Sequence, residues 1–469
     1  MDNTLFFPLL LAIGLPLLLG WAVMRFFWTS ATTENFFLRL AMAYGLGMGL
    51  LAQWILILGI LKIRFSLATI VGPLLGGSLF LLYFVWRRSR TRVLPTVSDC
   101  PGCVAERATS SLLNISLLIF ICMNSIYVFW VAWNIPLYEW DSIATHAFNA
   151  KVLFYERSLL WQKNFPHGTY PLQVPFMQMW IGICLGRWDD QLLKFFAPWT
   201  FLSYLTMQYF LVKRMSSRRW GLIGLCLLLS ANFFTFQAST AYRDFTMMYY
   251  NCGTMLLLLF WLQDKKNHWI TFAGLFAGFG SFTKMEGAGY LLIQAIVWTV
   301  IVAREPGLRL RQRWEAWGRF LAPAAGIALI YFAYKQWILL PQISSKGFDL
   351  AAFDLAHIQV HVGWEYLPRI GVVIHRFLVD LLLSGNWNYL WPLLWICLLN
   401  IDWESRRREI PLLLGSLGLY FLVYLAGYSF SQHYSWVAND NAALSRSILH
   451  FFPLAVLLII FILAPKKSS

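Results

Sequence analysis

The sequence predicts an all-α polytopic membrane protein, with about 13 transmembrane helices and additional helices along the external interface. Its composition is 59% hydrophobic and only 13% charged, which excludes an ordinary soluble domain. Many apolar runs reach about 18 residues or more, the length that a helix needs to cross a bilayer. Short clusters of Lys and Arg separate these runs, as expected for loops that set membrane orientation.

The apolar runs divide the chain into three regions. We expect a three-span appendage at 1–86, a basic and proline-containing cytoplasmic linker at 87–111, and a transmembrane module at 112–469. The predicted spans lie near residues 5–24, 36–60, 66–86, 112–133, 191–212, 219–236, 245–262, 268–282, 286–303, 319–340, 386–401, 410–428 and 447–464. The first run has no basic segment before it and no small-residue cleavage site, so we interpret it as a retained span.

The basic clusters assign a side to each loop. They fall in every second loop, so all of them can be cytoplasmic at once: 213–219, 263–268, 304–314, 404–409 and 466–467. The external side then receives two long loops, 134–190 and 341–385, besides shorter ones. Two apolar segments inside these loops, 172–186 and 366–384, are interpreted as interfacial helices. A span at 172–186 would place the basic clusters on opposite sides.

The net charge of +15 is largely accounted for by these clusters, so it predicts a bilayer as partner and no nucleic acid. The high counts of 24 Trp and 20 Tyr fit aromatic belts at the two membrane interfaces.

The pair Cys100 and Cys103 forms a single C-x-x-C, which can be half of a zinc site or a redox pair. Because no second pair follows, an inert linker feature is favoured and no disulfide framework is predicted.

Seven ionisable residues gather at the predicted external level of the module. They are Asp141, Arg243, Asp244, Lys284, Glu286, Arg446 and His450. Ionisable side chains at the margin of a membrane bundle are costly to place there and are functional candidates. Carboxylates such as Asp141 and Asp244 can accept a proton from a hydroxyl, and the cations can hold a phosphate. The set therefore suggests transfer of a group from a lipid-linked phosphate to a hydroxyl.

Each of these residues also has a purely structural interpretation. Asp141 can be a solvated loop charge, and Arg243 and Asp244 can pair with each other at a helix start. Lys284 and Glu286 can form an ion pair across a turn. Arg446 can be an interfacial side chain, and His450 a packed helix residue.

A metal site is a further possibility that the sequence raises. The stretch "FDLAHIQVH" places His357 and His361 four residues apart, with Asp354 three before His357, and this spacing can ligate zinc. No clear third protein ligand of the zincin type and no H-E-x-x-H follow, so no metal site is predicted. A monophosphate can leave without a metal, so no cofactor is required, although two external carboxylates can bind a divalent metal.

The order of short motifs along the module resembles a known family. The motifs are "EWDS" at 139–142, "YPLQVPFMQMWIGICLG" at 170–186, "TAYRDF" at 240–245, "FTKMEG" at 282–287 and "ALSRSILHFFPL" at 443–454. Together they resemble the GT-C superfold of integral-membrane glycosyltransferases over roughly residues 112–464. The likeness is greatest to the branch of protein O-mannosyltransferases and lipid A aminoarabinose transferases.

The resemblance implies a function and a role for each matched position. Asp141 would activate the acceptor hydroxyl, Asp244 would be the second external carboxylate, and Lys284 and Arg446 would contact the donor phosphate. The donor would be a polyprenyl-phosphate sugar, the acceptor a hydroxyl of a glycan, lipid or protein, and the reaction inverting. The family often has Asp-Glu in the first loop, whereas here Glu139 comes two residues before Asp141. The expected location is the bacterial inner membrane, with the site facing outside in the cell envelope.

Two other functions stay open at this stage. An O-antigen-ligase-like enzyme would use a diphosphate-linked donor and external loops rich in Arg and His, which this chain also has. A transporter or flippase of a lipid-linked sugar would place charges near the bilayer midplane, with broken helices and an inverted repeat. The sequence shows no internal repeat, and its charges gather at one interface.

Overall fold

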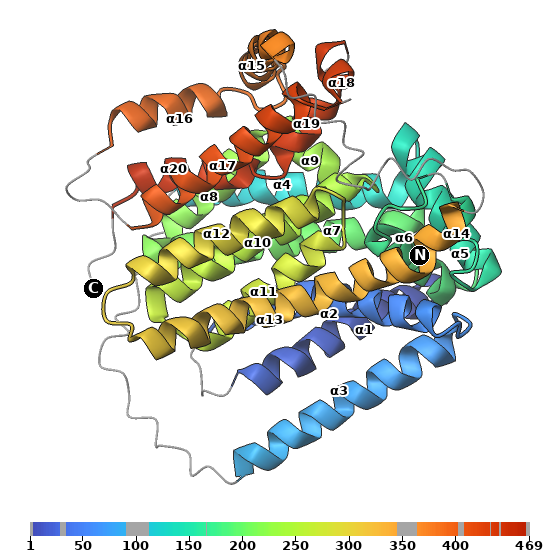
Figure 1. Cartoon of the computed structure of the whole chain (residues 1–469). Coiled ribbons are helices and arrows are strands. Elements are labelled where there is room, and N and C mark those ends of the chain that lie inside the picture. The colour runs from blue at the N-terminus through green and yellow to red at the C-terminus, as the bar shows by residue number, and fades with distance from the viewer. Residues whose placement is uncertain are drawn as a thin grey trace.

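The computed structural model describes residues 3–28, 34–90, 112–165, 167–344, 364–401, 408–431, 433–439 and 442–465. Throughout these residues the regular structure is helical, without a strand. Long helices lie side by side and run in broadly the same direction across the molecule (Figure 1). The prediction of an all-α polytopic protein is confirmed.

In chain order, the first four helices are α1 (Asn3–Phe27), α2 (Phe36–Ile60), α3 (Leu67–Arg90) and α4 (Leu112–Asn134). The first long loop contains η1 (Ser142–Ala147), α5 (Phe148–Glu156), η2 (Gln162–Asn164), α6 (Gln173–Leu185) and η3 (Leu192–Lys194). The central helices are α7 (Phe196–Met215), α8 (Arg218–Ser230), α9 (Asn232–Ser239), α10 (Arg243–Asp264), α11 (Asn267–Ser281), α12 (Gly287–Arg304), α13 (Leu310–Tyr334), η4 (Lys335–Leu339) and α14 (Leu340–Ser344). The last are η6 (Trp364–Tyr366), α15 (Leu367–Leu383), α16 (Leu390–Leu399), α17 (Glu409–Ser429), α18 (Tyr434–Ala438), α19 (Ala442–Leu449) and α20 (Phe452–Leu463).

Eight helices in the described residues are long and apolar enough to cross a membrane: α1, α2, α3, α4, α10, α12, α13 and α17. The number rises to ten if α8 with α9, bent by 79°, and α19 with α20, bent by 48°, each form one span. Helices α7, α11 and α16 occupy the other three predicted positions. Of these, α11 has 15 residues and α16 has 10, which is short for a complete crossing. The count of 13 therefore stays a prediction.

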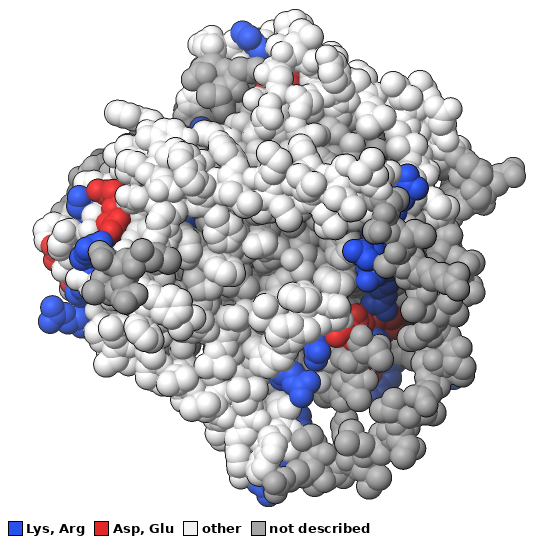
Figure 2. Space-filling model, turned by 180° about the vertical axis from the view of Figure 1, so that it is seen from behind, with Lys and Arg blue, Asp and Glu red and all other residues white. Residues whose placement is uncertain are grey.

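Charged side chains lie mostly at two opposite ends, and a broad band of uncharged residues separates them on the face in Figure 2. At one end, ion pairs join four of the predicted basic clusters. Arg214 contacts Asp264 at 2.9 Å, Lys265 contacts Glu305 at 2.7 Å, and Arg408 contacts Glu305 at 3.3 Å. The fifth cluster, at 466–467, lies outside the described residues. The four clusters that the structure describes thus share one end of the bundle, as their spacing predicted.

Helix α10 extends from one charged end of the bundle to the other, so its length gives the distance between them. Its first turn carries Asp244, and its last residue is Asp264 of the basic end. Twenty-two residues at about 1.5 Å per residue give a helix of about 33 Å. This length is close to the hydrocarbon thickness of a bilayer, about 30 Å.

The first two helices are part of the central core. The Trp180 indole donates to the carbonyl of Ala12 at 2.9 Å, and the Tyr250 hydroxyl donates to the carbonyl of Gly45 at 3.0 Å. By contrast, α3 lies at the edge of the bundle (Figure 1). The division of the chain at 87–111 stays a prediction, but α1 and α2 are bonded directly to α6 and α10 of the main module.

Both segments predicted as interfacial helices are helical. Helix α6 is buried over nearly its whole surface, so protein surrounds it on all sides. It packs against α1, α2 and α5. In α15, Asp380 is buried and accepts a hydrogen bond from Ser445 at 2.6 Å. The depth of either helix relative to a membrane stays a prediction.

Two hypotheses from the sequence fall on residues that the structure does not describe. These are the C-x-x-C pair, Cys100 with Cys103, and the histidine pair, His357 with His361. The cysteines that are described are all free: Cys122, Cys184, Cys226, Cys252 and Cys397.

Helices α1 and α2 cross at a contact that only glycine permits. A Cβ atom on Gly20 would lie 1.7 Å from the carbonyl oxygen of Ala43, and one on Gly47 would lie 1.6 Å from that of Pro16. Small residues at such crossings let helix backbones approach closely within membranes. The contact is reciprocal, so neither helix can accommodate a side chain without moving.

We predict that Gly47→Ala lowers the free energy of unfolding. Alanine by itself stabilises a helix by roughly 1 kcal/mol relative to glycine, but the added Cβ forces α1 and α2 apart, and the lost packing outweighs that gain. Gly76→Ala in α3 is the matched control, because no atom lies within 4 Å of the added Cβ. Melting temperatures of the two variants test this, with equal values for both contradicting the packing argument.

Candidate active site

Three segments that are distant in sequence meet around the carboxylate of Asp244, at the end of the bundle opposite the basic clusters. Lys284 Nζ, from the turn between α11 and α12, donates to Asp244 Oδ1 at 2.9 Å. His450 Nε2, from the break between α19 and α20, contacts the same oxygen at 3.0 Å. Lys284 also contacts Glu286 at 3.1 Å. The structure therefore brings together four residues that the sequence singled out.

The turn that presents Lys284 is held from two sides. The Thr283 hydroxyl lies 2.7 Å from Gln173 Oε1 of α6 and 2.9 Å from the carbonyl oxygen of Phe279. A Cβ on Gly287 would lie 2.2 Å from the carbonyl oxygen of Gly280, so α12 can begin here only with glycine. The Gly-rich turn thus has a packing function: it fixes the place from which Lys284 reaches Asp244.

Lys284 and Glu286 are both charged in this arrangement. Burial by itself lowers the pKa of Lys284, yet attraction by Asp244 and then by Glu286 outweighs it and raises that pKa above its usual value. Burial likewise raises the pKa of Glu286, but Lys284 outweighs it and holds that pKa below its usual range. The turn therefore carries a stable ion pair beside a buried carboxylate.

His450 lies in the break between α19 and α20 and is fully buried. Its Nδ1 atom is 2.8 Å from the hydroxyls of both Tyr290 and Tyr424, which also contact each other. A hydroxyl that donates to Nδ1 leaves the proton of the neutral ring on Nε2, which donates to Asp244. The backbone carbonyl of His450 accepts from Asn251 Nδ2 at 2.7 Å. The histidine is thereby held at every polar atom and orients Asp244.

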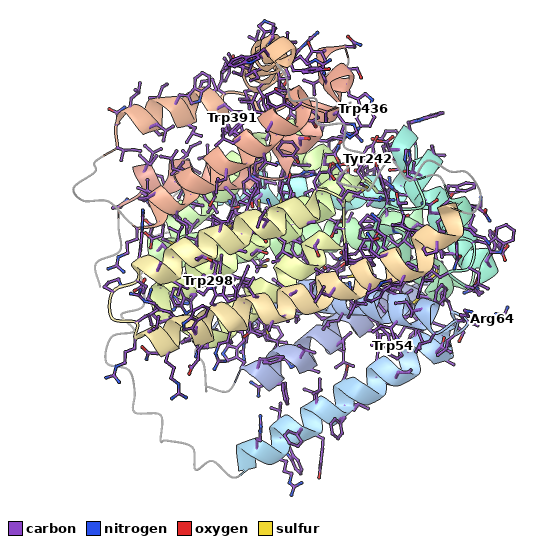
Figure 3. All side chains as sticks on the ribbon, in the orientation of Figure 1. Trp54, Arg64, Tyr242, Trp298, Trp391 and Trp436 are labelled. Carbon is purple, nitrogen blue, oxygen red and sulfur yellow. The ribbon has the colours of Figure 1, made fainter. Side chains whose placement is uncertain are left out.

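A second ion pair lies beside this cluster. Arg446 pairs with Asp141, and the two side chains retain 27% and 37% of their exposure. The Arg446 guanidinium also lies over the ring of Tyr242, 5.4 Å from its centre. Tyr242 precedes α10 and lies toward the end of the bundle opposite Trp298 (Figure 3). Asp141 is the more accessible carboxylate of the two, and Asp244 is the buried one.

Several residues near the site were missed by the sequence analysis. His146 follows Asp141 by five residues, within the π-helical turn η1. Burial first, then the positive charge of Arg243, lowers the pKa of His146 well below its usual value. Such π-helical turns are frequent at functional sites, but the sequence carries no clear signal for them. Tyr424 had a weak signal, because tyrosines recur every four residues along α17.

Two ionisable residues, Glu139 and Lys194, are buried between α4 and α7. Glu139 is 5% exposed, and neither carboxylate oxygen has a hydrogen-bond partner among the described residues. Lys194 Nζ lies 3.5 Å from the carbonyl oxygen of Pro136. Burial lowers the pKa of Lys194, and the nearby Glu139 opposes that shift. Glu139 is therefore a buried carboxylate that no described side chain contacts through a hydrogen bond.

In the described part of the chain, no group of three or more His, Cys, Asp and Glu side chains is placed to hold a metal ion. Asp141, Asp244 and Glu286 each contact a cation. Whether the reaction needs a metal stays a prediction, because the His357 segment lies outside the described residues.

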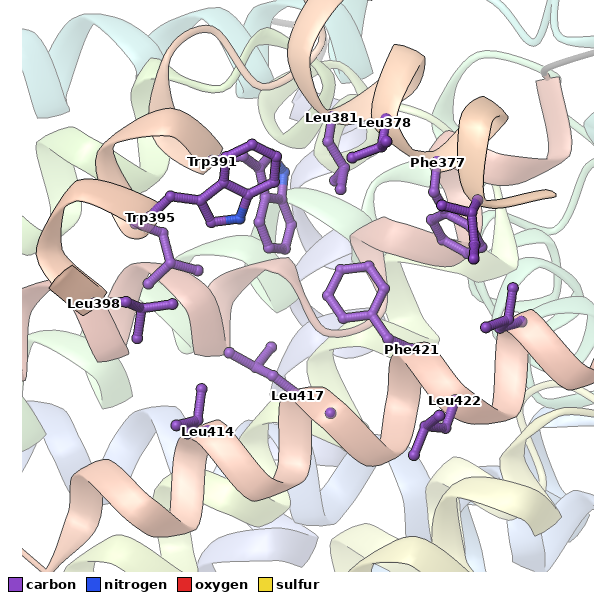
Figure 4. A pocket seen from close by; sticks show the side chains of 14 residues that line it. Phe377, Leu378, Leu381, Trp391, Trp395, Leu398, Leu414, Leu417, Phe421 and Leu422 are labelled. Atoms are coloured by element: carbon purple, nitrogen blue, oxygen red, sulfur yellow. The ribbon is translucent and has the colours of Figure 1, made fainter. Parts of the chain in front are cut away.

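An apolar pocket of about 360 Å³ lies between α15, α16 and α17. Phe377, Trp391, Leu417 and Phe421 point into it (Figure 4). Its lining contains no ionisable group, so it can accommodate hydrocarbon but cannot carry out proton transfer. On α17, Phe421 faces this pocket and Tyr424 contacts His450, so one helix separates the pocket from the charged cluster.

Comparison with known proteins gives one match. Residues 173–337 match the family model described as dolichyl-phosphate-mannose-protein mannosyltransferase. This match supports a GT-C glycosyltransferase. The matched segment contains Asp244, Lys284 and Glu286, whereas Asp141 and Arg446 lie outside it. No curated protein and no solved structure matches the chain.

We predict that Lys284→Met destabilises the protein by about 3–5 kcal/mol, because it leaves the buried Asp244 carboxylate without its cation. Adding Asp244→Asn to this variant should recover part of the loss, because a neutral amide needs no counter-charge. Thermal unfolding of the single and double variants measures both effects. A double variant no more stable than Lys284→Met would contradict the pairing argument.

The lowered pKa of His146 predicts a pH dependence of stability. The folded protein keeps His146 neutral, whereas the unfolded chain binds its proton below its usual pKa of 6.5. Stability is therefore fully present above pH 6.5 and declines as the pH falls toward the lower pKa of the folded state. The melting temperature of His146→Asn should fall less between pH 7 and pH 5 than that of the wild type. Parallel pH profiles would rule out this contribution.

Proposed function

We propose that the protein is an inverting glycosyltransferase that moves a sugar from a polyprenyl-monophosphate donor to a hydroxyl acceptor on the external face of the membrane. The supporting observation is the pairing of a partly exposed carboxylate, Asp141, with Arg446, next to the cluster in which Lys284 and His450 hold the buried Asp244 and Glu286 contacts Lys284. Both lie at the end of the bundle away from the basic clusters. The family match to residues 173–337 supports the glycosyltransferase class.

In the proposed reaction, Asp141 is the general base. It accepts the proton of the acceptor hydroxyl as that oxygen forms a bond to the anomeric carbon. The bond from that carbon to the phosphate oxygen breaks on the opposite face, and the phosphate leaves with the bonding electrons. Attack opposite the leaving group inverts the anomeric centre. Asp141 retains partial exposure, which suits a base that must meet an acceptor.

The cations bind the leaving phosphate in this proposal. Lys284, Arg446 and Arg243 all contribute to binding the donor. In the structure, Arg446 is held by Asp141. A donor phosphate that draws Arg446 toward itself leaves Asp141 free to accept a proton, so donor binding precedes activation of the acceptor.

The remaining residues act through these groups. Asp244 orients Lys284, and Glu286 fixes the same ammonium from its other side. His450 holds Asp244 in place through Nε2. The apolar pocket between α15, α16 and α17 offers a surface for the hydrocarbon chain of a lipid donor. Burial of that chain would supply binding free energy without changing the chemistry.

The proposal is tested with purified protein in nanodiscs and a panel of radiolabelled polyprenyl-monophosphate and polyprenyl-diphosphate sugars. We expect turnover of a monophosphate donor, reduced by about 10² or more in Asp141→Asn because general-base catalysis is lost. Asp190→Asn is the matched control, because its amide oxygen can still accept the 2.7 Å hydrogen bond from Trp188.

Turnover of diphosphate donors alone would favour an O-antigen-ligase-like enzyme instead. If neither donor class is consumed, and lipid-linked sugar crosses sealed vesicles, the protein is a transporter.

A further inference from the structure

Arg243 differs from the other cations of the site in having no carboxylate contact. Lys284 contacts two carboxylates, and Arg446 contacts one. Although Arg243 directly precedes Asp244, the pairing of the two that the sequence suggested is not formed. Asp244 is instead held by Lys284 and His450. Arg243 is thus the cation of this site whose charge no ion pair compensates within the described part of the chain.

The guanidinium of Arg243 is buried and has no hydrogen-bond partner. The residue is 1% exposed, and Nε, Nη1 and Nη2 all lack a partner among the described residues. The ring of Tyr170 lies next to it, with its centre 5.2 Å from the guanidinium carbon, and Asp244 and Glu286 attract its charge without contacting it. A cation–π contact offsets only part of the cost of removing five N–H donors and a charge from water. Such an arrangement is expected where a ligand completes the site.

The backbone at this position also favours an anion. Arg243 begins α10, a helix of 22 residues, and the preceding Tyr242 provides no side-chain cap. The first N–H groups of a helix have no partner within the helix and carry the positive end of its dipole. A helix start of this kind binds phosphate readily. The unpartnered guanidinium is a second and independent feature at the same place.

We propose that Arg243, at the start of α10, binds a phosphate monoester, and that this phosphate belongs to the donor lipid. The proposal rests on the glycosyltransferase function above and deepens it, because it makes Arg243 the main phosphate contact. The planar guanidinium binds two phosphate oxygens at once, which an ammonium cannot do. Lys284 keeps its two carboxylate contacts, so its ammonium is less available to the phosphate than the guanidinium of Arg243. The ring of Tyr170 is partly exposed, so a phosphate that displaces it reaches the guanidinium from the surface.

The test compares the thermal stability of wild type, Arg243→Met and Arg243→Lys, each with and without ligand. The ligands are polyprenyl monophosphate without sugar, inorganic phosphate, and the uncharged polyprenol. Because Arg243→Met removes a buried charge without a partner, we expect it to melt at the same temperature as unliganded wild type or higher. Its binding of polyprenyl monophosphate should weaken at least about tenfold, as for the loss of one side of a buried charge pair. Arg243→Lys should bind with intermediate strength, because it keeps the charge but not the planar geometry.

Arg187→Met serves as the control. This arginine lies in the first loop, which also contains Tyr170, but its side chain is 60% exposed and paired with Asp189. It should keep the full stabilisation by polyprenyl monophosphate. A shift given by inorganic phosphate alone, equal to that of the lipid, would show that the site binds free phosphate and overturn the assignment to the donor.

The remaining outcomes separate this inference from the proposed function. If Arg243→Met binds polyprenyl monophosphate as tightly as wild type does, the phosphate site is elsewhere, and the inference is wrong while the function stands. If Arg243→Met unfolds at a lower temperature and keeps the ligand shift, Arg243 is structural. If the wild type neither binds polyprenyl monophosphate nor consumes any polyprenyl-monophosphate sugar, both the inference and the proposed function are wrong.

Discussion

The buried carboxylate of Asp244 is the constraint on which the arrangement of the site depends. A negative charge that is 1% exposed, at the start of a buried helix, must be compensated by cations or hydrogen bonds, since the local dielectric is low. Lys284 and His450 both supply this compensation through one oxygen, Oδ1. Their positions then fix the turn before α12 and the break before α20. Three helices are thereby aligned around one atom.

Further contacts extend this constraint through the outer half of the bundle. His450 can orient Asp244 only because Tyr290 of α12 and Tyr424 of α17 hold its other ring nitrogen. The turn that carries Lys284 is in turn bound to α6 through Thr283 and Gln173. The first loop, which supplies Asp141, is therefore connected to the central helices by hydrogen bonds as well as by apolar packing. The two carboxylates, one accessible and one buried, are held in environments that suit different roles.

The charges of the site are nearly balanced without a ligand, and the exception is informative. Lys284 and Arg446 each have carboxylate partners, so their attraction for an incoming phosphate is reduced. Arg243 has none. A guanidinium that no carboxylate contacts has N–H donors left for an anion, and this distinguishes the site from a uniform positive patch. The stacked Tyr170 ring stabilises the guanidinium without neutralising it.

The sequence by itself determined the class of the fold, the approximate positions of most helices and the identity of the candidate polar residues. These follow from composition, apolar run length and the spacing of basic clusters, which are local properties of the chain. It also indicated that Asp244, Lys284 and Glu286 share one level, because each lies at a helix end on the same side.

Only the tertiary structure decided which charges pair. Arg243 and Asp244 are neighbours in sequence, yet Asp244 pairs with residues 40 and 206 positions away. The bend at His450, the π-helical turn after Asp141 and the burial of α6 were likewise absent from the pattern. The physical reason is that pairing, bending and burial depend on which helices pack together, and long-range packing leaves no periodic signal in the sequence.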